Sequence, residues 1–198
     1  MKKIMALLCF VFAFVPAQKL FAQQFSLGAG WAYHFYVSHS GSDAKTSVAP
    51  GLSLDFEASI PMSDAIAIAT GASFTGVAGY HFGGNSSVNL GEIFFDVPVR
   101  AKFNIPLPGR VKMGVFAGPV LSVNLVSIDA HASNTINNYE AYPNLRRFDI
   151  LLGAGVSVDI IDHIRAIAGF DYGLLDRNAK AGEWLHRGQL KVGVQYIF

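Results

Sequence analysis

Gln189-Leu190-Lys191-Val192-Gly193-Val194-Gln195-Tyr196-Ile197-Phe198 closes the chain with an alternation of side-chain types. Every even-numbered residue of this stretch is apolar, whereas most odd-numbered residues are polar or glycine. A period of two residues indicates a β-strand, in which successive side chains point to opposite faces. One apolar face for lipid and one polar face for an interior is typical of a strand in an outer-membrane β-barrel.

The composition favours a single domain that is not surrounded by water alone. The chain has 198 residues, of which 52% are hydrophobic and only 15% are charged. Its mean hydropathy of +0.36 is high for a soluble protein. The net charge of +1 offers no bulk attraction to nucleic acid, so we expect no nucleic-acid partner.

The N-terminal residues predict a secretory signal peptide. The apolar run over residues 4–17 is too short to span a bilayer as a helix, and it directly follows Lys2 and Lys3. We expect cleavage after Ala22, which gives a signal peptide over residues 1–22 and a barrel domain over residues 23–198. The single cysteine, Cys9, would leave with the signal, unless it serves as a lipoprotein anchor, which the bulky Leu8 disfavours.

The same alternation recurs along the whole chain and predicts eight strands. We expect them over residues 25–38, 48–60, 65–80, 88–104, 110–125, 147–160, 164–175 and 187–198. The connections are alternately long and short, the longest covering residues 126–146. Outer-membrane barrels have short periplasmic turns and longer external loops. The sequence therefore predicts an all-β fold, an eight-stranded antiparallel up-and-down transmembrane β-barrel with both termini periplasmic.

The charged residues of the predicted strands share the polar face, as a lipid-facing barrel wall requires. A Lys or Arg on the lipid face at the membrane midplane would cost about 2 to 4 kcal/mol. Seven acidic and eight basic residues are expected to face the interior: Asp55, Glu57, Glu92, Asp96, Arg100, Lys102, Arg110, Lys112, Arg147, Asp149, Asp159, Arg165, Asp171, Arg187 and Lys191.

These charges predict ion pairs inside the barrel, since the interior of eight strands is just wide enough to be filled by side chains. A tight turn at residues 161–163 would place Asp159 opposite Arg165. Four bases are expected near the periplasmic end, with Asp55 and Glu57 as partners: Arg100, Lys102, Arg110 and Lys112. The bases could instead form an anion-binding or partner-facing patch.

Pro98 and Pro119 lie inside predicted strands, where proline cannot donate to the neighbouring strand. Such prolines usually mark β-bulges, and we expect bulges at both positions.

No catalytic residue, cofactor site or metal site is predicted. Histidines that could act beside serines in a lipid-modifying enzyme lie at strand ends or in loops, without a spacing that fixes a base next to a nucleophile: His34, His39, His81 and His131. The segment Asp176-Arg177-Asn178, with Glu183, lacks a complete calcium-loop pattern and is interpreted as a solvated loop. Tyr139, Tyr142 and Trp184 are the candidates for contact with a partner or with lipid headgroups.

Several segments are similar to the PorT-type outer-membrane β-barrel family of Bacteroidetes. They are residues 92–103, with Pro98 and Lys102; residues 114–119, with Gly118-Pro119; residues 148–156; and Asp171-Tyr172-Gly173-Leu174. The resemblance covers most of the chain after the signal and is strongest over residues 92–175. Gly169 departs from it, because the family often has a basic residue there. The resemblance implies a small barrel and brings no catalytic residues.

The sequence thus favours a non-enzymatic barrel in the outer membrane of a Gram-negative cell. Its partners are expected to be outer-membrane lipid and other envelope or secretion proteins, because the namesake of the similar family is needed for protein secretion. Two alternatives stay open: a small adhesin-like or envelope-stabilising barrel, and a lipid-modifying enzyme. A soluble ligand-carrying barrel is disfavoured by the terminal Phe198 and by the outer face without charges.

Overall fold

The computed structural model describes residues 24–40, 43–83, 86–106, 111–131, 134–178 and 183–198. The predicted signal peptide lies outside these residues. Strands dominate the described chain, and eight of them are long: β1 (Gln24–Ser40), β2 (Asp43–Pro61), β3 (Ile66–Gly83), β4 (Ser86–Pro106), β5 (Lys112–His131), β7 (Phe148–Ile161), β8 (Ile164–Gly173) and β9 (Glu183–Ile197). A short strand β6 (Asn134–Asn137) and a one-turn helix α2 (Asn138–Ala141) lie between β5 and β7.

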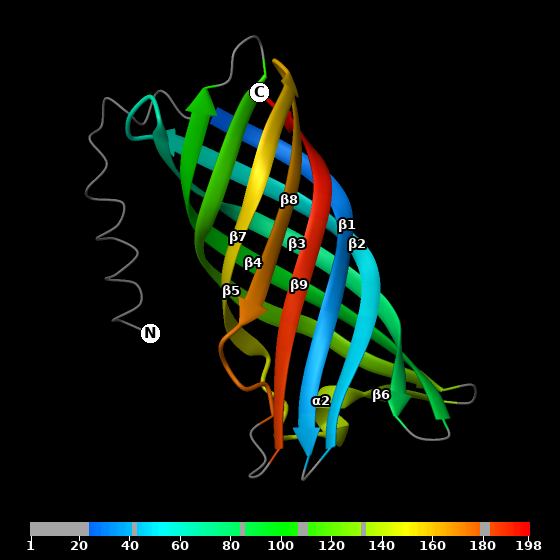
Figure 1. Cartoon of the computed structure of the whole chain (residues 1–198). Helices are drawn as coiled ribbons and strands as arrows, with labels where there is room; N and C mark the ends of the chain where they lie inside the picture. Colours follow the sequence, from blue (N-terminus) through cyan, green and yellow to red (C-terminus); the bar gives the residue numbers. More distant parts are fainter. Residues whose placement is uncertain (1–23, 41–42, 84–85, 107–110, 132–133, 179–182) are drawn as a thin grey trace.

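The eight long strands form a closed antiparallel barrel. Each pairs with its neighbours in chain order, and β1 also pairs with β9, for example Leu27 with Tyr196. Figure 1 shows the strands winding obliquely around the barrel axis. The predicted fold class is therefore confirmed. We call the end that holds Gln24 and Phe198 the terminal end, and the end that holds α2 and β6 the loop end.

The two faces of the wall differ as the alternation predicts. Small and polar side chains are buried inside, among them Ser26, Ser53, Ser73, Asn124, Gln189 and Gln195. Large apolar side chains are exposed on the outside, among them Leu27, Leu54, Phe74, Leu152 and Val194. We call the halves of the barrel nearer these two ends the loop half and the terminal half. The only apolar core cluster among the described residues lies inside the loop half and comprises Tyr36, Ala49, Val77 and Phe94, with Leu185 packed against them.

Three predicted loops are partly strand. Residues 39–47 and 81–87 are mostly taken up by the ends of β1, β2, β3 and β4, and residues 126–131 continue β5. Backbone pairing in a hairpin does not need apolar alternation, so Gly, Ser and Asn can extend it where no apolar face is required. The longest connection, predicted over residues 126–146, therefore begins later than predicted, after His131, and it contains β6 and α2.

A β-bulge in β5 explains why its continuation was missed. Ile93 pairs with Val126 but Phe94 pairs with Asn124, so Leu125 is an extra residue in β5. Leu125 and Val126 are consequently both exposed, while Asn124 and Ser127 are both buried. The bulge reverses the phase of the strand, and the pattern of period two ends there.

The expected bulges at the two prolines are not found. On both sides of β4 the pairing register is the same before and after the prolines. Pro98 has no pair on β3 and Pro119 has none on β4, whereas Pro98 pairs with Val120 and Pro119 pairs with Leu152. Proline has no N–H to donate, so a pairing is lost without an extra residue. Gly118 keeps the neighbouring backbones close, because a Cβ there would lie 2.1 Å from the Val99 carbonyl oxygen.

A stacked pair of one histidine and one tyrosine lies at each end of the apolar outer surface. On β9, His186 stacks with Tyr172 at the loop end, and Tyr196 stacks with His163 at the terminal end. Positions 186 and 196 are ten residues apart, which corresponds to about 33 Å along a strand and about 25 Å along the axis at a tilt of ~40°. This height equals the apolar band of an outer-membrane barrel.

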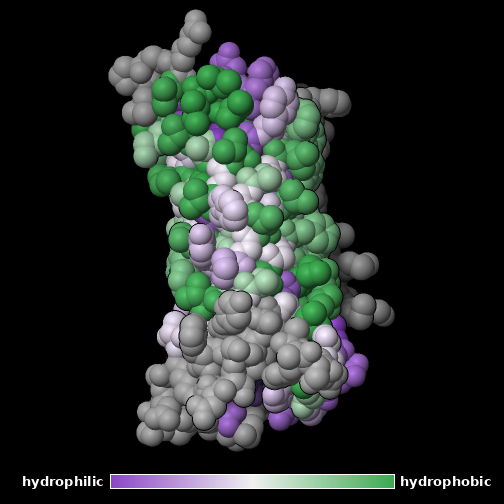
Figure 2. All heavy atoms as spheres, turned by 90° about the vertical axis from the view of Figure 1, so that its right-hand side faces the viewer, coloured by the Kyte–Doolittle hydropathy of each residue, from purple (hydrophilic) through white to green (hydrophobic). Residues whose placement is uncertain are grey.

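In Figure 2, the most hydrophilic residues visible on one face lie toward the two ends of the barrel. Among the described residues, no helix has the length and apolar character needed to cross a membrane.

Candidate functional site

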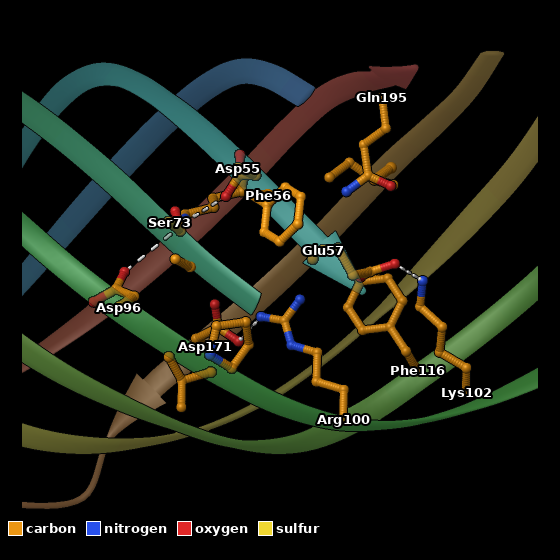
Figure 3. Close-up of a pocket in the computed structure, with 16 residues that line it drawn as sticks. Asp55, Phe56, Glu57, Ser73, Asp96, Arg100, Lys102, Phe116, Asp171 and Gln195 are labelled. Atoms are coloured by element: carbon orange, nitrogen blue, oxygen red, sulfur yellow. Dashed lines mark hydrogen bonds and ion pairs between the residues drawn. The ribbon is translucent and has the colours of Figure 1, made fainter. Parts of the chain in front are cut away.

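The barrel interior contains a network of ion pairs. In the terminal half, these pairs join residues that were predicted from the sequence to form ion pairs. Asp159 of β7 and Arg165 of β8 are register partners, with Arg165 Nε 2.5 Å from Asp159 Oδ1. Lys102 of β4 donates to Glu57 of β2, and Arg165 Nη1 lies 3.8 Å from the same Glu57 carboxylate. Figure 3 shows Lys102 and Glu57 pointing toward one another across the lumen.

Two predicted site residues have partners other than those expected. Arg100 Nη2 lies 2.7 Å from Oδ1 of Asp171, rather than beside Asp55 or Glu57. Asp55 instead accepts from Lys191 Nζ at 3.2 Å. The alternation of side chains predicts that Asp171 and Lys191 face the interior, but it does not give their depth, because strand stagger in a closed barrel decides which side chains meet.

The middle of the lumen is almost filled. A cavity of about 40 Å³ lies between these pairs and is lined by Asp55, Arg100, Phe116, Asp171 and Lys191, among others (Figure 3). The guanidinium of Arg100 covers the ring of Phe116 at 4.7 Å from its centroid. This volume can hold a few water molecules but no larger solute.

Glu92 of β4 is the centre of the loop half. Its side chain is nearly fully buried, and its carboxylate accepts hydrogen bonds from Asn124 Nδ2 at 2.7 Å and Ser127 Oγ at 3.1 Å. The hydroxyl of Tyr36 also donates to it. A buried carboxylate needs such partners, since an unpaired one would be strongly destabilising.

Arg177 supplies the counter-ion of Glu92, and the interpretation of its segment as a solvated loop is wrong. Only 2% of Arg177 is exposed, and its Nη2 lies 3.2 Å from Glu92 Oε1. Backbone bonds hold it there: its N–H donates to Leu185 O, and its carbonyl accepts from Arg146 N. A residue in a connection has no strand phase, so no pattern in the sequence predicts that its side chain points inward.

A second arginine completes the loop half. Arg187 is fully buried, with Nη2 3.6 Å from Asp96 Oδ1 and 2.8 Å from Ser122 Oγ. The guanidiniums of Arg187 and Arg177 lie 3.9 Å and 5.3 Å from the ring centroid of Phe94. The aromatic ring therefore lies close to two cations, which stabilises both.

The remaining predicted bases lie at the edge of this network. Lys112 is exposed at the start of β5 and lines an open cavity of about 390 Å³ at the terminal end, together with Lys102, Asp159 and Arg165. Arg110 lies outside the described residues. Arg147, expected inside, precedes β7 and is exposed, because it extends past the strand end to cover the ring of Tyr139 at 3.9 Å.

The three predicted contact residues lie at the loop end in different environments. Tyr139 of α2 is partly buried, and burial raises the pKa of its hydroxyl. Tyr142 is 60% exposed just after α2. Trp184 of β9 stacks on His39 with their ring centroids 5.5 Å apart. Only Tyr142 is presented freely to solvent.

The described histidines do not form a nucleophile and base pair with a serine. His34 is buried in the lumen between Tyr36 and Phe94, with Nδ1 3.4 Å from the Tyr36 hydroxyl. His39 stacks on Trp184 at the outer surface. The side chains of His81 and His131 lie outside the described part. Within the described part, no cluster of three or more His, Cys, Asp or Glu side chains could hold a metal ion.

A closed eight-stranded barrel with an apolar outer band and a charged interior defines an integral outer-membrane β-barrel protein. Residues 5–198 match the family described as "outer membrane protein beta-barrel domain". The chain belongs to this family, and the outer membrane is its location.

Solved structures show the same fold. The chain is similar to Ail, the attachment invasion locus protein of Yersinia pestis, at 14% identity and a TM-score of 0.53, with 88% of this chain and 98% of that chain covered. It is also similar to neisserial surface protein A, at 17% identity and a TM-score of 0.50, with 88% and 97% covered. Among curated protein sequences, none matches the chain.

Proposed function

We propose that the protein is a non-enzymatic barrel with a structural or partner-binding function, specifically an accessory to protein secretion or surface assembly. The observation that carries this proposal is that ion pairs join different strands across the lumen in both halves of the barrel. A small cavity between ion pairs gives no path for diffusion of a solute. A barrel through which no solute can diffuse acts through its exposed surfaces.

The surfaces available are the loop end and the terminal end. The loop end presents Tyr142, Arg146 and Arg147, all exposed. The terminal end presents the open cavity with Lys112. We propose that the terminal end faces the periplasm, because its three turns are short while the longest connection lies at the loop end.

The PorT-type resemblance supports the secretion-accessory form of this proposal. It rests on segments of the wall that include Lys102, in its pair with Glu57, and Gly118, at its close backbone contact. An adhesin-like or envelope-stabilising function is the second candidate, favoured by the exposed aromatic and basic side chains at the loop end. A lipid-modifying function has less support, since His34 is enclosed by Tyr36 and Phe94.

Site-specific photocrosslinking in living cells would test the proposal. A photoreactive amino acid is placed at Tyr142 for the loop end, at Asp64 for the terminal end, and at Val192 as a control in the lipid-facing band. We expect one of the two ends to yield a defined protein adduct that the Val192 position does not give. Crosslinks to lipid alone at all three positions would contradict the partner-binding proposal and favour the envelope-stabilising one.

A conductance measurement tests the premise separately. The purified protein in planar bilayers should show no steady ion conductance, because the lumen is closed. Steady channels in the wild-type protein would contradict the proposal at its first step. A lipid analysis tests the enzymatic alternative. Cells that lack the protein should have the same lipid acyl chains as wild-type cells, whereas the loss of a lipid modification would favour an enzyme.

A further inference from the structure

The open cavity at the terminal end of the lumen, which we call the terminal cup, has the size of a ligand site. Its volume is about 390 Å³, and residues of six strands and of the β2–β3 turn line it. Sites for small ligands typically have about 300 to 1,000 Å³. Lys102 lines both the terminal cup and the cavity of about 40 Å³ in the middle of the lumen, so a ligand that enters the cup can go no further.

The floor of the terminal cup consists of charges that neutralise one another. Lys102 and Arg165 are both buried and both line the cup. Lys102 donates to Glu57 (Figure 3). Arg165 Nε and Nη2 lie 2.5 Å and 3.2 Å from the two carboxylate oxygens of Asp159. The floor is therefore fixed by two ion pairs and has no net charge.

Two other charges of the terminal cup lack such partners. Lys112 is directly opposite Asp159 in the pairing of β5 with β7, but both oxygens of Asp159 accept from Arg165. Within the described part of the chain, Lys112 consequently makes no ion pair. Asp64, in the β2–β3 turn, makes no ion pair or side-chain hydrogen bond to any described residue. Both side chains are exposed and line the cup, which thus offers one cation and one anion to a ligand.

The positions of these two charges set the length of a ligand that meets both. The Ala65 carbonyl, next to Asp64, accepts from the N–H of Asn104 on β4 at 2.7 Å, and Asn104 pairs with Gly114 on β5. Asp64 and Lys112 therefore lie on opposite sides of β4, two strand spacings or about 10 Å apart across the sheet. An extended tripeptide has nearly the same length, ~10 Å. Its ammonium and carboxylate ends can thus reach both charges.

The wall of the terminal cup suits the middle of a peptide. Ser59 and Ser157 contribute hydroxyls, and Asn104 contributes an amide. Each of these groups both donates and accepts hydrogen bonds, as the N–H and C=O groups of a peptide require. Ile105 and Met113 add apolar surface for a small side chain. The lining therefore matches a peptide along its length as well as at its ends.

We propose that the terminal cup binds a short peptide with free ends, with Lys112 donating to its carboxylate and Asp64 accepting from its ammonium. Because the floor is neutral, the preference for a zwitterion comes from these two residues. The proposal concerns binding alone. It does not depend on a protein partner at either end of the barrel, nor on which side of the membrane the terminal end faces.

Methyl NMR of the full barrel in lipid nanodiscs would test the proposal. Beyond the predicted signal peptide the sequence has two methionines, of which Met113 lines the terminal cup and Met62 does not. Trialanine should shift the methyl signal of Met113 and leave that of Met62 nearly unchanged. Acetylation of its amine or amidation of its carboxyl should each weaken binding about five-fold, the upper range for an exposed ion pair.

Two variants assign the two charges separately. In Lys112→Gln, amidation of the peptide should no longer matter, whereas acetylation should still weaken binding. In Asp64→Asn the opposite is expected. Both residues are exposed and take no part in the ion pairs of the floor, so both variants should fold. Arg146→Gln and Glu140→Gln change exposed charges at the loop end and serve as matched controls, which should bind trialanine as the wild-type protein does.

Three outcomes would overturn the proposal. No shift of Met113, or equal binding of trialanine and its doubly blocked form, would mean that the charged ends are not recognised. An equal loss of affinity for all four peptides in Lys112→Gln would mean that the lysine acts on any ligand and not on the carboxylate. Phosphoethanolamine that binds as tightly as trialanine would identify a zwitterionic headgroup as the ligand instead of a peptide.

Discussion

Removal of Glu92 should destabilise the barrel more than any other single loss of charge in the loop half. Glu92→Leu deletes the only ion-pair partner that Arg177 has among the described residues, and Arg177 itself is 2% exposed. Removing one partner of a buried pair costs about 3 to 5 kcal/mol, because the remaining charge stays buried without compensation. Arg177→Leu should cost less, about 1.5 to 3 kcal/mol, since Glu92 keeps three neutral donors: Tyr36, Asn124 and Ser127.

Urea unfolding of the barrel in lipid vesicles would measure these free energies, with Trp31 on the lipid-facing surface and Trp184 as fluorescent reporters. The double variant Glu92→Leu/Arg177→Leu should be more stable than Glu92→Leu alone by about 1 kcal/mol or more, because no charge is left unpaired. Glu140→Leu, which removes an exposed carboxylate of α2, should change the stability by less than about 0.5 kcal/mol. If the loss of stability in the double variant equals the sum of the losses in the two single variants, Arg177 is not paired with Glu92 in the membrane.

Three further changes test other parts of the wall. Arg165→Asp should reduce the folded fraction in a heat-modifiable gel assay, and Asp159→Arg in the same chain should restore it, because the two residues are paired; no rescue would argue against the pair. Leu54→Lys places a cation in the apolar band and should cost about 2 to 4 kcal/mol in urea unfolding, whereas Thr46→Lys at the loop-end boundary should cost about 1 or less; equal costs would mean that the band is misplaced. Gly118→Ala should lower the unfolding midpoint, because its Cβ would lie 2.1 Å from Val99 O, whereas Gly76→Ala, with nothing within 4 Å, should not.

The alternation of side chains was enough to predict the faces of the strands, because one residue of slippage would turn a whole strand over. It also predicted a local pairing, Asp159 with Arg165, since a tight turn fixes which residues of a hairpin are opposite. It could not predict that Arg100 meets Asp171. That contact crosses the lumen from β4 to β8 and depends on how far the strands are staggered when the barrel closes.

Two features escaped the sequence for different reasons. The continuation of β5 was hidden by the extra residue Leu125, which puts Leu125 and Val126 on the same face and ends the alternation. Arg177 was hidden because a connection has no period, and its partner Glu92 is 85 residues away. Long-range pairs of this kind depend on the closed fold and cannot be found from local spacing.

The ion pairs that cross the lumen also bear on the order of assembly. Asp55 on β2 meets Lys191 on β9, and Asp96 on β4 meets Arg187 on β9, so the last strand carries charges needed by early strands. Hairpins formed earlier must keep these carboxylates hydrated until β9 pairs with β1. The pairs then form late and contribute to the barrier against opening more than to the speed of insertion. Once inserted in the membrane, the protein should therefore unfold slowly and remain folded for long times, even if its insertion is also slow.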